Sequence, residues 1–164
     1  MPMAQYDRAA AVEYARKWAL SRNPAYYDYE GLGGDCTNFV SQCVYAGSGV
    51  MNYKPTFGWY YINANNHSPS WTGVPYLYNF LTRNTGAGPA GAETDILNVV
   101  PGDISQFADE NMNYYHSQLI VSVGHPAALN NILVCAHTDD SLNRPLSTYS
   151  FSRIRFVHIT GVSK

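Results

Sequence analysis

The sequence has few charged residues and no long apolar run, and each shortage excludes a class of protein. Charged side chains make up 13% of its 164 residues, ten basic against twelve acidic, and Lys and Arg form no cluster. Nucleic-acid binding needs a basic patch, so we expect no nucleic-acid partner. No apolar stretch approaches the length of a membrane span, and residues 1–7 lack the basic and apolar regions of a signal peptide. We therefore expect no membrane partner and a soluble, cytoplasmic chain, or a secreted or cell-wall associated one if it was excised from a longer precursor.

Cysteine is also scarce. The three cysteines, Cys36, Cys43 and Cys135, are odd in number and contain neither a CxxC pair nor a zinc-type spacing. This pattern predicts no disulfide framework, no metal site and no cofactor. Cys43 lies two helical turns beyond Cys36, and Cys135 lies in an apolar run, so both are expected to be small buried hydrophobic residues.

The order of the segments predicts one α+β domain over residues 1–164. Hydrophobic residues make up 46% of the chain, enough for a sizeable core. Apolar periodicity predicts helices over residues 6–22, from Cys36 to about residues 47–49, and over 74–83. Strand-like composition follows at 103–107, 116–123, 132–137 and 151–159. Residues 25–32 and 86–92 are expected to be loops, and 50–73 an ordered irregular segment. Helices followed by consecutive strands indicate helices packed on an antiparallel sheet.

Cys36 has the sequence context of a nucleophile. It follows Gly33, Gly34 and Asp35, and begins a predicted helix. Asp35 is a residue type that caps helices, and the free N–H groups and positive dipole end of a helix start favour a thiolate. The negative charge of Asp35 acts in the opposite direction on the thiol pKa, unless capping uses it locally.

Two histidines lie where they could complete a thiol hydrolase. His116 begins one predicted strand and His137 ends the next, so in an antiparallel hairpin they would lie side by side at one sheet edge. A cysteine amidase needs an imidazole that accepts the thiol proton and passes it to the leaving amine, and a polar group that orients this imidazole. Four residues remain open as that orienting group: His137, Asp139, Asp140 and Asn143.

These residues resemble a known family. The stretch GDCTNFVSQ at 34–42, PGD at 101–103, HSQLIV at 116–121, and His137 followed by LNRPLS at 142–147 resemble the bacterial putative amidase-domain family, across nearly the whole chain. More broadly, the order of cysteine and histidine is similar to papain-like peptidases of the NlpC/P60 and CHAP type. The resemblance implies a papain-like fold, with Cys36 as nucleophile, His116 as base and acid, and His137 in the third polar position. It also implies a tyrosine near the oxyanion, which Tyr26, Tyr27 or Tyr29 could provide.

The expected function is hydrolysis of an amide or peptide bond through an acyl-enzyme on Cys36, and the resemblance implies peptidoglycan-type peptides from the cell wall as substrates. Two alternatives stay open: a transacylase that uses the same nucleophile, and a catalytically degenerate module that binds peptide or glycan. Loop-rich aromatic segments often line substrate clefts. The residues expected to bind substrate are Asp35, Trp59, Tyr60 and Trp71. The sequence leaves the oligomeric state open.

Overall fold

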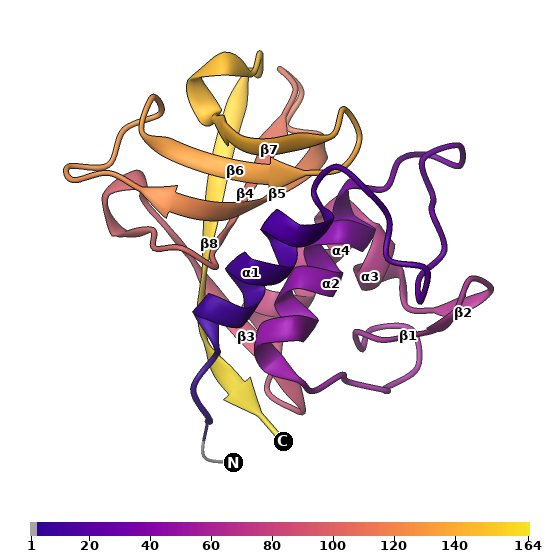
Figure 1. Cartoon of the computed structure of the whole chain (residues 1–164). Helices are drawn as coiled ribbons and strands as arrows, with labels where there is room; N and C mark the ends of the chain where they lie inside the picture. The colour runs from indigo at the N-terminus through magenta and orange to yellow at the C-terminus, as the bar shows by residue number, and fades with distance from the viewer. Residues whose placement is uncertain (1–2) are drawn as a thin grey trace.

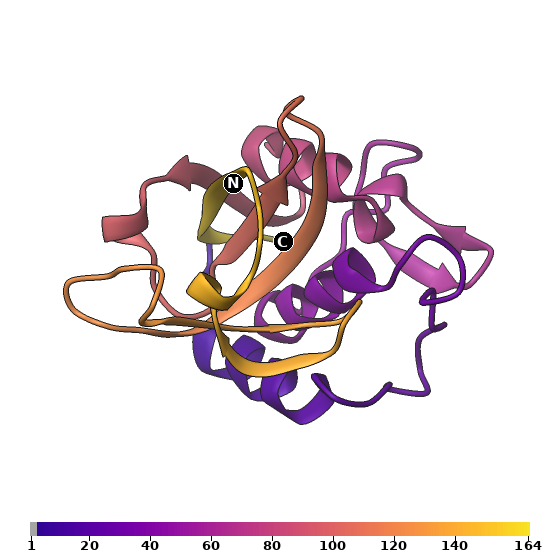
Figure 2. The same cartoon turned by 90° about the horizontal axis from the view of Figure 1, so that it is seen from above.

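The computed structural model describes residues 3–164 as helices packed against a curved antiparallel sheet (Figures 1 and 2). The helices come first: α1 (Arg8–Trp18), α2 (Cys36–Ser48), α3 (Pro69–Thr72) and α4 (Val74–Arg83). A small hairpin of β1 (Tyr61–Asn63) and β2 (Asn66–His67) lies between α2 and α3. The remaining strands are β3 (Gly88–Thr94), β4 (Ile104–Ala108), β5 (Tyr114–Val123), β6 (Ile132–Ala136), β7 (Ser141–Pro145) and β8 (Arg153–Ser163), with short 3-10 turns η1 (Ile96–Asn98) and η2 (Leu146–Thr148).

The large sheet has the strand order β3-β8-β4-β5-β6-β7, and each neighbouring pair is antiparallel. Figure 1 shows β5, β6 and β7 crossing above α1 and α2, while β8 runs down toward the C-terminus. The α+β class and the antiparallel sheet expected from the sequence are confirmed.

Helix ends follow local chemistry. Asp7 caps α1 by accepting a hydrogen bond from the N–H of Ala10. Gly49 ends α2 at φ 67°, a left-handed conformation that glycine adopts without strain. The structure gives α4 the same bounds, 74–83, that the apolar periodicity predicts.

The core has two parts, one on each face of the sheet. Between the helices and the sheet lie apolar residues that include Phe39, Leu119 and Cys135. On the opposite face lie others that include Phe107, Ile120 and Leu146. Cys43 and Cys135 are fully buried, as predicted. Each face of the central strands therefore has its own packing environment.

Two strand assignments from the sequence were wrong. Residues 86–92, expected to be a loop, contain most of β3, an edge strand held by backbone pairing with β8 although its Gly, Ala and Pro residues disfavour strands. Residues Ser141–Pro145, for which no strand was expected, form β7, and Asn143 lies within it. No helix among residues 3–164 is both long and apolar enough to cross a membrane.

Candidate active site

Cys36 is the first residue of α2, at the end of a glycine loop that packs against the turn between β6 and β7. Gly33 and Gly34 have φ of +98° and +107°, in the region that glycine adopts readily. A Cβ on Gly34 would come within 3.1 Å of Thr138 Oγ1, and that same hydroxyl accepts a hydrogen bond from the Asp35 N–H at 3.0 Å. The loop before the thiol is thus fixed against the sheet.

The Cys36 thiol faces strand β5. Its sulfur lies 3.7 Å from Thr37 Oγ1, and the nearby backbone N–H of Ser117 acts to lower the pKa of the thiol. Thr37 in turn bonds to the Ser117 hydroxyl at 3.0 Å, which ties the first turn of α2 to the strand. The side chain is 7% exposed.

The pKa of this thiol departs from the sequence-based expectation. Burial raises the pKa of Cys36, and the negative charge of Asp35 adds to the rise, while hydrogen bonds from Ser117 and Thr37 oppose it. Burial favours the uncharged thiol because the thiolate loses its hydration. The helix start alone therefore does not produce a thiolate at rest.

His116 precedes Ser117 in β5, but its imidazole lies on the other face of the strand. Ser117 points toward α2, and side chains alternate along a strand. His116 pairs in register with Phe107 of β4, and its ring centroid lies 5.8 Å from that of Phe107 and 6.1 Å from that of Tyr149. Among the hydrogen bonds of residues 3–164, none joins this imidazole to the Cys36 sulfur. The hydrogen bond between thiol and imidazole that such a pair uses in catalysis is therefore not formed in this structure.

The environment of His116 keeps it neutral. Burial lowers its pKa from the ordinary 6.5 to about 4, and the positive charge of Arg144 adds to this effect, while Asp139 opposes it. A neutral imidazole can accept a proton, as a general base must. Of the alternatives to His137, Asp139 is the carboxylate whose charge acts on His116, whereas Asp140 bonds to Arg22.

His137 forms a separate buried pair with Asp35. Its Nδ1 lies 2.5 Å from Asp35 Oδ2, and its Nε2 lies 2.7 Å from the carbonyl oxygen of Trp18. The ring also stacks on Phe39 with centroids 4.1 Å apart. Both ring nitrogens are in use, so the expected contact between His137 and His116 is not formed.

Strand register explains this separation of the two histidines. Leu119 pairs with Cys135, so the positions two residues away in each strand, Ser117 and His137, share the face that meets α2. His116 is one position from Ser117 and therefore lies on the opposite face.

Asp35 occupies the cap position of α2 without capping it. Its carboxylate makes no capping bond and accepts hydrogen bonds from the Tyr29 N–H at 2.9 Å and from Asn38 Nδ2 at 2.8 Å, in addition to its contact with His137. At 1% exposed it has no surface for a substrate, contrary to the expectation that it binds one. It fixes the start of the cysteine helix instead.

The aromatic residues expected to line a cleft are mostly core residues. Trp59 and Trp71 are fully buried, and their indole N–H groups donate to Ser41 and to Asn38 respectively. Tyr60 is half-buried, with its ring centroid 6.0 Å from that of Tyr53. Indole rings surrounded by polar sequence can thus be core residues, because their N–H groups find buried partners.

Sequence reasoning missed the residues that contact the two candidate groups, Thr37 and Ser117 at the thiol, and Phe107 and Tyr149 at the imidazole. The alternation of side chains in residues 114–123 was the available signal, since it separates position 116 from position 117. Among residues 3–164, no group of three or more His, Cys, Asp or Glu side chains is placed to hold a metal ion.

Comparisons with known proteins indicate an amidase at a coarse level. Residues 5–160 match the model of a family described as a putative amidase domain. An uncharacterized protein from Bacillus subtilis, YhbB, is 33% identical over 142 residues, which is 85% of this chain and 44% of that protein. The chain thus spans less than half the length of this relative. No solved structure matches the chain. With its match covering all but the ends of the sequence, the chain belongs to the putative amidase domain family.

Proposed function

We propose that the chain is a cysteine-dependent amidase with a papain-like arrangement, in which Cys36 attacks the carbonyl carbon of an amide or peptide bond. The observation that carries the proposal is the position of Cys36: it is the first residue of α2, and the next residue, Thr37, bonds to Ser117 of β5 at 3.0 Å. A cysteine on a helix start, packed against an antiparallel sheet, is also the arrangement that the resemblance to NlpC/P60 and CHAP enzymes implies.

The proposed reaction has two steps. In the first, the Cys36 sulfur bonds to the carbonyl carbon, its proton moves to His116, and His116 passes that proton to the leaving amine as the C–N bond breaks. In the second, water attacks the thioester, gives a proton to His116, and releases the acid as the sulfur regains the proton. The backbone N–H of Cys36, free at the helix start, is the proposed donor to the oxyanion.

His116 is the proposed base of this reaction. Its ring lies beside Phe107 and Tyr149, and proton transfer requires one of its ring nitrogens within hydrogen-bonding distance of the sulfur when substrate binds. The low pKa of His116 is compatible with a base that stays neutral until the attack occurs. Peptides of the peptidoglycan type remain the proposed substrates, on the resemblance alone.

The rival function is a binding module without turnover. Two features of the structure are also what a binding module would show. The pKa of the Cys36 thiol is raised, and no hydrogen bond within residues 3–164 joins its sulfur to His116. Turnover separates the two functions, because a binding module has none. Transfer of the acyl group to an added amine would identify the transacylase.

The test combines thiol labelling with amide turnover. A panel of synthetic peptide amides is incubated with the wild-type chain, Cys36→Ala and the matched control Cys43→Ala, a buried cysteine of the same helix. We expect hydrolysis by the wild type, none by Cys36→Ala, and retained hydrolysis by folded Cys43→Ala. An electrophilic thiol probe, followed by peptide mapping, should label Cys36 ahead of Cys43 and Cys135. Equal slow labelling of all three thiols, with no hydrolysis of any peptide, would contradict the proposal.

A further inference from the structure

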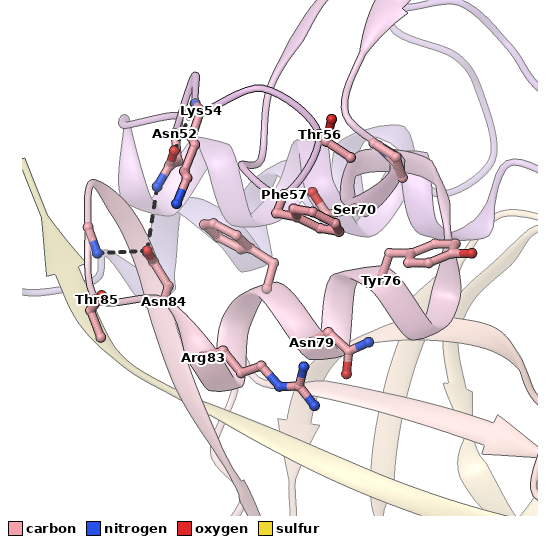
Figure 3. A pocket seen from close by; sticks show the side chains of 13 residues that line it. Asn52, Lys54, Thr56, Phe57, Ser70, Tyr76, Asn79, Arg83, Asn84 and Thr85 are labelled. Carbon is pink, nitrogen blue, oxygen red and sulfur yellow. Dashed lines mark hydrogen bonds between the residues drawn. The ribbon is translucent and has the colours of Figure 1, made fainter.

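A cavity of about 680 Å³ lies beyond the C-terminal end of α2, away from Cys36 (Figure 3). One wall is the segment 52–57, which follows α2, and the other includes α4 and residues 84–86. Helix α2 has 13 residues, so it separates the start of the helix from this end by about 20 Å. None of the residues of the candidate active site lines the cavity. It is therefore a distinct site.

The cavity has a positive lining. Lys54 and Arg83 contribute two cations, and no Asp or Glu lines it. Some other cations have acidic partners, such as Arg8 with Asp103 and Arg22 with Asp140. Within residues 3–164, Lys54 and Arg83 form no ion pair and no side-chain hydrogen bond. In a chain of net charge -2, this lining favours an anionic ligand.

The cavity also has exposed aromatic surface. Phe57 is 79% exposed and Tyr76 is 54% exposed, although both residue types usually pack inside. Asn79 lines the same space, and its amide makes no hydrogen bond within the part of the chain that the structure describes. Figure 3 shows Phe57 on the 52–57 segment above α4, and Tyr76 and Asn79 on the helix. Apolar rings combined with a few free polar groups are typical of small-ligand pockets.

The wall that carries Lys54 and Phe57 is preorganised. Gly58 donates its N–H to the Lys54 carbonyl at 2.9 Å, and a Cβ on Gly58 would approach that oxygen to 2.4 Å. Thr56 has φ 67°, an uncommon conformation for a residue with a side chain. Asn52 and Trp59 pair across the base of the turn. A fixed wall lowers the entropic cost of binding, and strained backbone tends to occur at binding sites.

We propose that this cavity binds an acidic saccharide, a sugar ring that carries a carboxylate. The carboxylate would pair with Lys54 and Arg83, since a guanidinium matches a carboxylate in geometry and charge. The apolar face of the ring would lie on Phe57 or Tyr76, and its hydroxyls would bond to Asn79. A simple inorganic anion would leave the aromatic rings unused, and an aromatic acid would leave the Asn79 amide without a partner. The site does not rest on the amidase proposal.

Glucuronate and its neutral amide, glucuronamide, are matched probes for this site, because they differ only at the carboxyl group. Binding is followed by titration of backbone amide NMR shifts. We expect glucuronate to shift the resonances of 54–57 and 83–86 in a saturable way, and to bind at least about fivefold more tightly than glucuronamide, as one exposed charge pair can provide. Lys54→Gln and Arg83→Gln should each weaken glucuronate binding by about fivefold, and Phe57→Ala should weaken both probes.

The matched control is Arg153→Gln, which removes the charge of an exposed arginine outside the cavity. Arg153→Gln should leave the affinity for glucuronate unchanged. Cys36→Ala should leave it unchanged too, and that result would show that glucuronate binding does not depend on the amidase chemistry. Equal binding of the two probes, shifts outside the cavity, or equal weakening by Arg153→Gln would overturn the proposal. Saturable binding of inorganic phosphate or benzoate without glucuronate would overturn it too, since either would identify a different ligand class.

Discussion

Replacing Asp35 should reveal how the cysteine helix is held. Its buried carboxylate contacts His137 Nδ1 at 2.5 Å, the Tyr29 N–H at 2.9 Å and Asn38 Nδ2 at 2.8 Å. In Asp35→Ala these three donors lose their acceptor inside the protein. Removal of one partner from a buried ion pair costs about 3 to 5 kcal/mol of unfolding free energy, so a loss in this range is expected.

Asp35→Asn should be milder, for a reason that lies in His137. The Trp18 carbonyl can only accept, so His137 Nε2 must carry a hydrogen. A neutral His137 then has an acceptor at Nδ1, and the amide of Asn at position 35 can donate to it while its oxygen still accepts from Tyr29 and Asn38. In Asp35→Asn the hydrogen bonds of this side chain persist and only its negative charge is lost. The unfolding free energy should therefore fall by about 1 to 2 kcal/mol.

The assay is urea unfolding at neutral pH, with Asp95→Ala as the matched control. Asp95 is an exposed carboxylate that accepts from the Leu97 N–H and from Asn98, without an ion pair, and its loss should cost at most about 1 kcal/mol. If Asp35→Ala cost no more than Asp95→Ala, or no more than Asp35→Asn, the Asp35–His137 pair would not be what fixes the start of α2.

Four further results are expected. Gly34→Ala should lower the unfolding free energy by about 1 to 3 kcal/mol in the same assay, because φ +107° disfavours any side chain and the new Cβ would meet Thr138. Asp103→Ala should lower the unfolding free energy by about 3 to 5 kcal/mol, since this buried carboxylate pairs with Arg8 at 2.7 Å and lies 2.9 Å from His158 Nδ1. A loss of unfolding free energy below about 1 kcal/mol would contradict a structural role for residues 101–103, the PGD sequence. Stability should fall as pH drops from 6.5 to about 4, because the unfolded chain protonates His116 first, and His116→Gln should reduce that slope. Alkylation of Cys36 by iodoacetamide should rise with pH through a midpoint above that of an ordinary thiol, because burial raises its pKa; a plateau already reached in acid would show a preformed thiolate.

The parts of the fold that the sequence predicted are those with a strong side-chain signal. Helix α4 was predicted over its observed bounds because its apolar residues, such as Leu77 and Phe80, recur on one buried face. Strand β3 was missed because it depends on backbone pairing with β8, and its sequence GPAGAET carries no strand signal. Strand β7 was missed because Thr138 and Asp139 form the preceding turn with φ of 62° and 65°, without the glycine that usually marks such a turn.

The candidate site was predicted in its residue types and not in its contacts. The glycine loop, Asp35 and the helix start at Cys36 are local features, and the structure contains them where the sequence placed them. The pairing of β5 with β4 and β6 determines which face of the sheet His116 occupies. Each of these pairings contains an irregularity, between Phe107 and Ala108 in β4 and between Ile120 and Ser122 in β5. A shift of one residue in strand register moves a side chain to the opposite face of the sheet. Position along the chain alone therefore could not predict the partner of His137.

The two groups proposed for catalysis are both uncharged at rest, and for the same reason. Burial raises the pKa of the Cys36 thiol and lowers that of the His116 imidazole, so at neutral pH neither residue gains by ionising alone. A thiolate–imidazolium pair would need the two side chains in contact, and no hydrogen bond joins them within residues 3–164. In the proposed reaction, transfer of the thiol proton to His116 then accompanies attack on the carbonyl. In the proposed reaction a bound substrate activates the thiol, and the polar contacts of Asp35 and His137 keep Cys36 in place while His116 accepts the proton.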